Sequence, residues 1–202
     1  MSASPDRDSS GLPALILASA SPRRREILSR IGVAFTVVPS LIPEEHPPVA
    51  PAEAITAVAV AKARAVARSL HGDRPTVVLG ADTEVVLGGQ LMGKPRDAAD
   101  AVRILTALRG RVHDVITGVA AVGVGTTEAE EATAVTSRVW MRAYEDEEIL
   151  AYVKTGEPLD KAGAYAVQGI GRRLVAKVDG CLTNVIGLPL ATTRRLLARW
   201  GF

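Results

Sequence analysis

Hydroxyl and cationic side chains follow a short apolar run near the start of the chain. Serine caps helix N-termini well, and proline suits the first helical position because its missing N–H is not needed there. The free N–H groups of a helix start favour an anion, and guanidinium groups add fixed positive charge. The spacing therefore predicts a phosphate-binding corner. The apolar run spans residues 15–18, and Ser19, Ser21, Pro22, Arg23 and Arg24 follow it.

A carboxylate follows a second apolar run. Residues 76–79 are apolar and β-prone, and Gly80 and Asp82 come directly after them. We expect a buried strand that ends before Asp82, because α/β proteins place catalytic and metal-binding groups just past the carboxyl ends of strands. Gly80 would allow a ligand to approach the backbone closely. Asp82 is therefore the candidate for a catalytic or metal-binding carboxylate.

Eight polar positions form a candidate set with more cations than carboxylates. Such a set suits a polyphosphate bound with a divalent metal, because cations neutralise phosphate oxygens while a carboxylate holds Mg²⁺ or orients water. Few carboxylates are needed, since Mg²⁺ usually binds only one or two of them and keeps its waters. The set consists of Arg23, Arg24, Glu44, Lys62, Asp82, Lys94, Lys161 and Gln168.

Two of these candidates and one histidine also have a plainer interpretation. Glu44 and Glu45 lie in a proline-rich loop, where glutamates are usually solvated surface charges. Lys62 lies in the C-terminal half of a predicted helix and, taken alone, is a surface lysine. His113 begins a predicted strand, and spacing pairs it with no carboxylate or second histidine, so we interpret it as structural.

Composition and missing motifs exclude several classes of function. The net charge is only +2 and aromatic residues make up 3% of the chain, which argues against a nucleic-acid-binding protein. The chain has no Walker A sequence and no G-x-S-x-G elbow, so a kinase or a serine hydrolase is poorly supported. The single cysteine, Cys181, excludes an intramolecular disulfide. The residues alone thus predict a phosphate-binding α/β enzyme.

Hydrophobic periodicity and capping residues predict alternating strands and helices with no linker between domains. Residues 1–11 are polar and predict a disordered tail, whereas residues 12–202 predict a single domain. Residues 156–171 read as a long functional loop and residues 184–189 as a turn. The predicted strands are 15–18, 33–39, 76–79, 85–87, 90–92, 112–125, 130–143 and 174–178, and the predicted helices are 22–30, 51–70, 97–108, 144–154 and 189–200.

No segment is expected to enter a membrane. Residues 12–20 imitate the apolar core of a signal peptide, but the run is short and acidic residues flank Arg7. No later run approaches the roughly 18 apolar residues that a membrane span requires. We therefore expect a cytoplasmic protein and leave a homodimer open as its assembly.

Six short motifs, in order along the chain, resemble those of a known family. Together they are similar to the successive motifs of the Maf family, nucleoside triphosphate pyrophosphatases that were formerly described as septum-formation inhibitors. The resemblance spans about residues 15–197, and the order of several separate motifs makes it specific. The motifs are ASASPRR at 18–24, GADT at 80–83, GKP at 93–95, HDVITG at 113–118, DKAGAY at 160–165 with QG at 168–169, and GLP at 187–189.

The resemblance implies a fold, a reaction and a cofactor. The fold would be similar to inosine triphosphate pyrophosphatase, an α/β fold with a long mixed sheet flanked by helices and two lobes around a cleft. The enzyme would cleave a nucleoside triphosphate between its α and β phosphorus atoms, giving a nucleoside monophosphate and pyrophosphate. The reaction would require a divalent metal cation such as Mg²⁺, Mn²⁺ or Co²⁺.

The resemblance also assigns roles to single residues. Asp82 would be the general base or metal-bound carboxylate that readies the water, and Glu44 would be a second metal ligand. Arg23, Thr83 and Gln168 match positions linked to base selection. The remaining substrate contacts would be Ser19, Ser21, Arg24, Lys62, Lys94 and Lys161.

Within the family, the chain resembles the subgroup that prefers dTTP and UTP. Arg23 follows the proline and Gln168 follows Tyr165, whereas a subgroup that prefers 7-methyl-GTP has an aromatic residue after the proline. Ala166 departs from the subgroup, which commonly has glycine there, so the fine base preference is open. A non-catalytic, nucleotide-binding regulator of cell division or septum formation is the alternative function.

Overall fold

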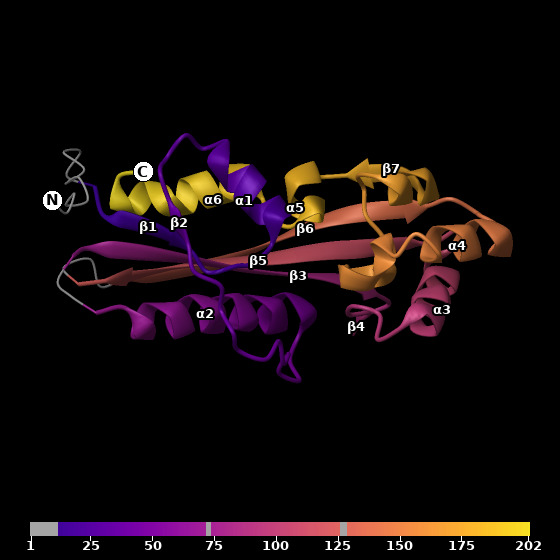
Figure 1. Ribbon diagram of the computed structural model, residues 1–202, viewed down its shortest axis with the longest axis horizontal. Helices are drawn as coiled ribbons and strands as arrows, with labels where there is room; N and C mark the ends of the chain where they lie inside the picture. Colours follow the sequence, from indigo (N-terminus) through magenta and orange to yellow (C-terminus); the bar gives the residue numbers. More distant parts are fainter. Residues whose placement is uncertain (1–11, 72–73, 126–128) are drawn as a thin grey trace, which may run out of the picture.

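The computed structural model describes residues 12–71, 74–125 and 129–202 (Figure 1). Its described residues form a seven-stranded mixed sheet of order β2-β1-β3-β5-β6-β7, with β4 paired to β3. Long antiparallel pairings of β3 with β5 and of β5 with β6 form its middle. The strands are β1 (Ala14–Leu17), β2 (Thr36–Val37), β3 (Thr76–Leu87), β4 (Gln90–Leu91), β5 (Val112–Val124), β6 (Glu130–Met141) and β7 (Val175–Asp179).

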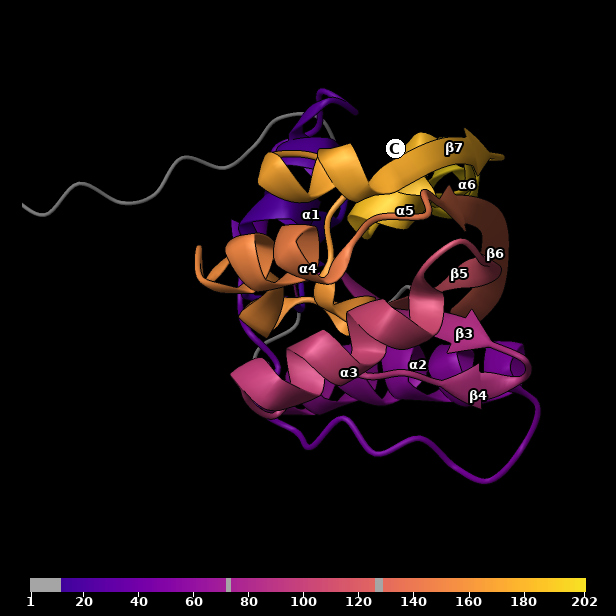
Figure 2. The same ribbon diagram turned by 90° about the vertical axis from the view of Figure 1, so that its right-hand side faces the viewer.

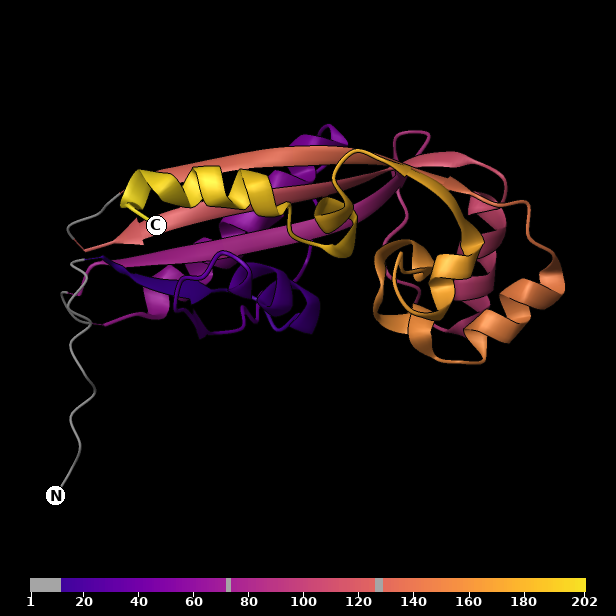
Figure 3. The ribbon, with the colours of Figure 1, turned by 90° about the horizontal axis from the view of Figure 1, so that it is seen from above.

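Helices cover both faces of this sheet. In Figure 1, α2 lies along one face, while α1 and α6 lie along the other. Helices α3 and α4 gather at one end of the long strands, as Figures 2 and 3 show from the side and from above. The α-helices are α1 (Pro22–Ser29), α2 (Pro51–Ser69), α3 (Ala98–Leu108), α4 (Asp146–Val153), α5 (Leu182–Ile186) and α6 (Leu190–Leu197), and the 3₁₀ turns are η1 (Glu157–Asp160), η2 (Ala162–Ala164), η3 (Ile170–Leu174) and η4 (Ala198–Trp200). The expected sheet flanked by helices is confirmed, whereas the two lobes around a cleft stay a prediction.

Helix α2 packs very closely on the sheet because the contacting residues are small. A Cβ on Gly118 of β5 would lie 2.8 Å from the Cα of Thr56, and a Cβ on Gly80 of β3 would collide with the carbonyl of Ala59. Glycine removes these clashes, so the helix backbone rests almost on the strands. This close approach places the C-terminal half of α2 beside the middle of β3.

The predicted start of α1 is confirmed. The Ser21 hydroxyl accepts a hydrogen bond from the backbone N–H of Arg24, and Pro22 is the first helical residue. The predicted cap of α3 is confirmed as well, since the Asp97 carboxylate accepts from the backbone N–H of Asp100. Both helix starts are therefore fixed by local hydrogen bonds that the sequence specifies.

The predicted end of the strand at 76–79 is wrong. β3 continues through Gly80 and Asp82 to Leu87, with Gly80 opposite Ala120 and Asp82 opposite Gly118 of β5. Gly80 looked like the end of a strand, but it is the point where α2 crosses. Asp82 therefore lies inside a long strand rather than just past its end.

Two further predicted elements are corrected. The strand expected at 33–39 is only Thr36–Val37, because β2 pairs with just two residues of β1. The turn expected at 184–189 begins within α5, since Asn184 is buried and its Nδ2 donates to the Val115 carbonyl at 2.9 Å. A buried asparagine that bonds a neighbouring strand stabilises a helix here instead of a turn.

The long hairpin expected at 112–143 is confirmed by the pairing of β5 with β6. Residues 126–128 at its tip, and the predicted tail of residues 1–11, lie outside the described residues. Among the helices that the structure describes, none has the length and apolar character needed to cross a membrane.

Candidate active site

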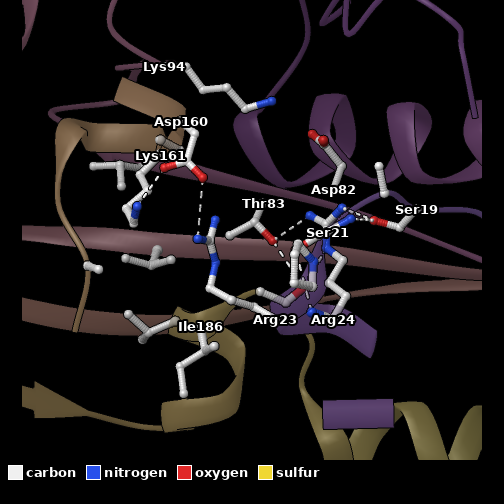
Figure 4. A pocket seen from close by; sticks show the side chains of 18 of the residues that line it. Ser19, Ser21, Arg23, Arg24, Asp82, Thr83, Lys94, Asp160, Lys161 and Ile186 are labelled. Atoms are coloured by element: carbon white, nitrogen blue, oxygen red, sulfur yellow. Dashed lines mark hydrogen bonds and ion pairs between the residues drawn. The ribbon is translucent and has the colours of Figure 1, made fainter. Parts of the chain in front are cut away.

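A pocket opens along β3 between two of its neighbours. On this side of β3, β1 pairs with residues 76–79 and β4 pairs with Val86 and Leu87. The pocket lies at the stretch between those pairings and has a cavity volume of about 360 Å³ (Figure 4). All eleven predicted site residues line it, from separate regions of the chain: Ser19, Ser21, Arg23, Arg24, Glu44, Lys62, Asp82, Thr83, Lys94, Lys161 and Gln168.

The start of α1 forms one wall of the pocket. Arg24 donates to the Gly187 carbonyl at 2.9 Å, to Thr83 Oγ1 at 3.1 Å and to Ser19 Oγ at 3.3 Å. Burial lowers the pKa of the Arg24 guanidinium, although the nearby carboxylates oppose this shift. Three neutral acceptors hold the guanidinium in place, so its positive charge faces the pocket with no paired carboxylate among the described residues.

Arg23 extends across the pocket from the same helix. Its Nη1 lies 3.6 Å from an oxygen of Asp160, whose side chain is 70% exposed. Figure 4 shows Arg23 reaching towards the segment of Asp160 and Lys161, away from the side where Ser19 and Asp82 lie. An ion pair this exposed contributes little stability, so Arg23 can exchange Asp160 for a ligand at small cost.

A chain of alternating charges crosses the floor of the pocket. Lys62 Nζ donates to Asp82 Oδ1 at 2.8 Å and to Glu44 Oε1 at 2.5 Å. Lys94 Nζ donates to the other oxygen of Glu44 at 2.7 Å. Lys62 is 5% exposed and Asp82 is 3% exposed. The interpretation of Lys62 as a surface lysine is therefore wrong, and Glu44 is a bridge between two lysines.

The second Asp82 oxygen contacts His46, a residue that the sequence interpretation missed. His46 Nε2 lies 2.8 Å from Asp82 Oδ2. Glu84 follows two positions after Asp82 on β3 and is also buried. Burial, reinforced by the charge of Asp82, raises the pKa of Glu84 to about 7.

These three residues form a group that can hold a cation. One ligand atom each from His46, Asp82 and Glu84 lies within 4.8 Å of the other two. Glu84 Oε2 is buried and has no hydrogen-bond partner among the described residues. Because a buried carboxylate oxygen without a partner is costly, a divalent cation fits this donor set on chemical grounds.

The opposite wall is formed by the segment between η1 and η3. Lys161 Nζ donates to the Glu157 carbonyl and to Asp160 Oδ1, both at 2.5 Å, and Gln168 is exposed at the pocket. The Tyr165 hydroxyl lies 2.7 Å from His113 Nε2. Burial lowers the pKa of His113 to about 4, so this imidazole is neutral and supports a pocket-lining ring, as a structural histidine does.

The sequence did contain a signal for one missed residue. Side chains two apart on a strand share a face, so Glu84 joins Asp82 once β3 is known to continue past Gly80. The signal for His46 was weaker: it lies two residues after Glu44, but in a loop whose sequence has no periodicity. Only the folded loop brings His46 to Asp82.

Comparison with known proteins agrees with this geometry. The model of the Maf family, described as Maf-like protein, matches residues 14–200. The chain belongs to the Maf family. A dTTP/UTP pyrophosphatase of Moorella thermoacetica is 50% identical to it over 190 residues, which cover 93% of this chain and 95% of that relative. A dTTP/UTP pyrophosphatase of Anaeromyxobacter dehalogenans is 49% identical over 196 residues, or 94% of this chain and 95% of the relative.

This Maf chain also has a more distant similarity to a solved structure. A crystal structure of a nucleoside-triphosphatase, named dITP/XTP pyrophosphatase, from Mycobacterium abscessus is 16% identical and has a TM-score of 0.44. The match covers 93% of this chain and 94% of the Mycobacterium abscessus chain. The membership in the Maf family rests on the family match and on the relatives, not on this structure.

Proposed function

We propose that this Maf chain hydrolyses nucleoside triphosphates between the α and β phosphorus atoms, with dTTP and UTP as its substrates. One observation carries the proposal: a buried carboxylate, Asp82, is bound to the buried Lys62 in a pocket that other cations also line. Cations placed before the substrate arrives stabilise a triphosphate and the charge that develops on its leaving group. Relatives that cover nearly the whole chain are named for this reaction.

The residues of the pocket divide into two groups by position. Arg24 lies at the start of α1 on one side, where phosphate oxygens would bind. Lys94 and Lys161 approach from other elements and would neutralise the remaining phosphate charge. If the α phosphorus lies nearest to Asp82, water attacks there, the α–β bond breaks, and pyrophosphate rather than orthophosphate leaves.

The proposed role of Asp82 is to take a proton from the attacking water. Lys62 binds one of its oxygens and His46 the other, so the carboxylate has a fixed orientation. A general base needs this fixed geometry more than it needs flexibility. Lys62 also balances the charge of Asp82, which would otherwise lie unpaired in a buried position.

A divalent cation is the proposed cofactor, with His46, Asp82 and Glu84 as the residues that would hold it. When bound, such a cation polarises phosphoryl oxygens and lowers the pKa of bound water. An imidazole in the donor set favours Mn²⁺ or Co²⁺ over Mg²⁺, which prefers oxygen alone. Glu44 as a metal ligand stays a prediction, and it would have to release Lys62 or Lys94 to serve.

Direct binding tests the proposed ligands without any turnover. Titration calorimetry with Mn²⁺ alone should give an affinity that falls about tenfold or more in His46→Gln, as loss of a ligand implies. His71→Gln is the matched control, because His71 is exposed and is not part of the cluster. Equal affinities in all three proteins would remove His46 from the proposed ligand set.

Base selection is proposed for Arg23, Thr83 and Gln168. Thr83 Oγ1 already contacts Arg24, Thr117 and the Gly187 carbonyl, so it acts within a network and has little freedom to reorient. Gln168 and Arg23 are more accessible and can adapt to a base. A preference for thymine and uracil would depend on them.

A hydrolysis panel of canonical and modified triphosphates tests the function. We expect pyrophosphate from dTTP and UTP in the presence of a divalent metal, little orthophosphate, and no turnover by Asp82→Asn. Tight nucleotide binding without turnover over a range of metals would favour the non-catalytic regulator instead. The cytoplasmic location and the homodimer stay predictions.

A further inference from the structure

The pocket wall formed by residues 160–168 is a closed loop whose two ends meet at one residue, Glu157. Its backbone carbonyl accepts from Lys161 near the start of the loop at 2.5 Å. Its carboxylate reaches the other end: Oε2 accepts from the Ile170 N–H and Oε1 from the Gly171 N–H, both at 3.0 Å. The segment that lines the pocket lies between these two attachments.

A third donor fixes the carboxylate itself. The Tyr152 hydroxyl, which comes from α4, donates to Glu157 Oε1 at 3.0 Å. Tyr152 is 3% exposed and belongs to the apolar cluster at this end of the sheet. Through Tyr152, the loop is attached to the packed body of the protein rather than only to itself.

The backbone of the loop is shaped around this carboxylate. A Cβ on Gly169 would lie 2.8 Å from Glu157 Oε2, and Gly169 has φ 67° and ψ −147°, a conformation that only glycine adopts readily. A Cβ on Gly171 would collide with the Tyr152 hydroxyl. Two glycines thus leave room for the contacts of Glu157.

We propose that Glu157 is a positioning residue for nucleotide selection. Its carboxylate fixes the segment that carries Gln168, and its backbone carbonyl binds Lys161. Gln168 precedes the Glu157-bound amides by only two and three residues, so its place depends directly on them. Glu157 is not among the residues that line the pocket, so it acts through the loop and not on the substrate. The inference rests on the proposed function of this pocket.

The Glu157 carboxylate should affect substrate binding far more than the chemical step. Asp82 lies on β3 and Lys62 on α2, and their mutual hydrogen bond involves no residue of the loop. Loss of the Glu157 carboxylate releases the segment that carries Gln168, but it leaves Asp82 and Lys62 in place and keeps the Glu157 carbonyl that Lys161 contacts. A closed segment that opens also gains conformational freedom, which binding must remove again.

Kinetics of three variants separate positioning from mere structure. In Glu157→Ala we expect KM for dTTP to rise on the order of 10–100-fold, from the lost charge-assisted hydrogen bonds, with kcat changed by less than about threefold. The preference for dTTP and UTP over dCTP should shrink in parallel. Glu157→Gln keeps an acceptor oxygen for Gly171 and Tyr152 but loses the Ile170 bond, so it should rescue part of the effect.

Glu147→Gln is the matched control, since it removes the same charge from an exposed position on α4. Hydrogen exchange gives a readout that needs no turnover: the amides of Ile170 and Gly171 should lose protection in Glu157→Ala and keep it in Glu147→Gln. The proposal would be overturned if Glu157→Ala lowered kcat equally for all nucleotides. It would also be overturned if the Ile170 and Gly171 amides lost protection while KM stayed unchanged. If the wild-type chain hydrolyses no triphosphate, the proposed function fails, and the exchange data still decide whether Glu157 holds the loop.

Discussion

Lys62 should stabilise the fold mainly through one of its two carboxylate partners. It is 5% exposed, and it binds Asp82, which is 3% exposed, and Glu44, whose side chain is 40% exposed. Removing one member of a buried ion pair leaves the other uncompensated, which costs about 3–5 kcal/mol. Water can solvate Glu44 after the loss of Lys62, but it solvates the buried carboxylate of Asp82 far less.

The perturbation is therefore a double-mutant cycle of Lys62→Met and Asp82→Asn. Lys62→Met alone should lower the free energy of unfolding by about 3–5 kcal/mol, equivalent to a fall in Tm of roughly 6–20 °C for a chain of this size. Asp82→Asn alone should cost within about 1 kcal/mol, because it also removes the repulsion between Asp82 and Glu84. The double variant should recover roughly 2–3 kcal/mol relative to the sum.

Urea unfolding with a chelator present is the assay, so that no bound cation replaces the missing charge. A second cycle of Lys62→Met with Glu44→Gln is the control, and its coupling should be below about 1 kcal/mol because Glu44 is exposed. The reasoning would be refuted if the stability loss of the double variant equalled the sum of the losses of Lys62→Met and Asp82→Asn within about 0.5 kcal/mol. They would mean that Lys62 is held by Glu44 and only lies near Asp82.

Three further predictions follow from other contacts. The pKa of His113 is about 4 in the folded chain and 6.5 in the unfolded chain, so the unfolded chain binds a proton first as pH falls. The free energy of unfolding should therefore fall by about 2 kcal/mol between pH 7 and pH 5. Urea unfolding of His113→Gln should lack that loss. Gly118→Ala should lower the free energy of unfolding by about 1–3 kcal/mol in the same assay, because the new methyl meets the backbone of α2; an unchanged free energy of unfolding would contradict the close packing. Arg24→Lys cannot reach Gly187, Thr83 and Ser19 together, so KM for dTTP should rise about tenfold, and an unchanged KM would exclude this role.

Local signals predicted the helix starts and the long hairpin well. Ser21 with Pro22, and Asp97 three residues before Asp100, specify hydrogen bonds that form within one turn of helix. The interior of β3 was predicted poorly, because the interpretation of Gly80 depends on what lies against it. In a strand that faces solvent, glycine indicates an end, but here it indicates the crossing of α2. That contact joins parts of the chain that are distant in sequence and leaves no local pattern.

The members of the site were predictable from motif resemblance, but their connections were not. Ser19, Arg24 and Asp82 belong to motifs, and the structure brings them to one pocket. The contact of His46 with Asp82 depends on how a proline-rich loop folds over β3, and the attachment of Glu157 to Ile170 depends on a turn at Gly169. Such contacts need three-dimensional geometry, because the residues that make them have no fixed spacing.

The burial of Lys62 could have been inferred from the sequence without a motif. It lies four residues after Val58 and four before Val66, and both valines are on the buried face of α2. Residues four apart share a helix face, so this spacing places a lysine in the middle of an apolar stripe. A buried lysine requires carboxylate partners from other elements, since an unpaired charge in the interior is too costly. A charge on an apolar helix stripe therefore indicates opposite charges supplied by other elements, and here those are the buried Asp82 and the exposed Glu44.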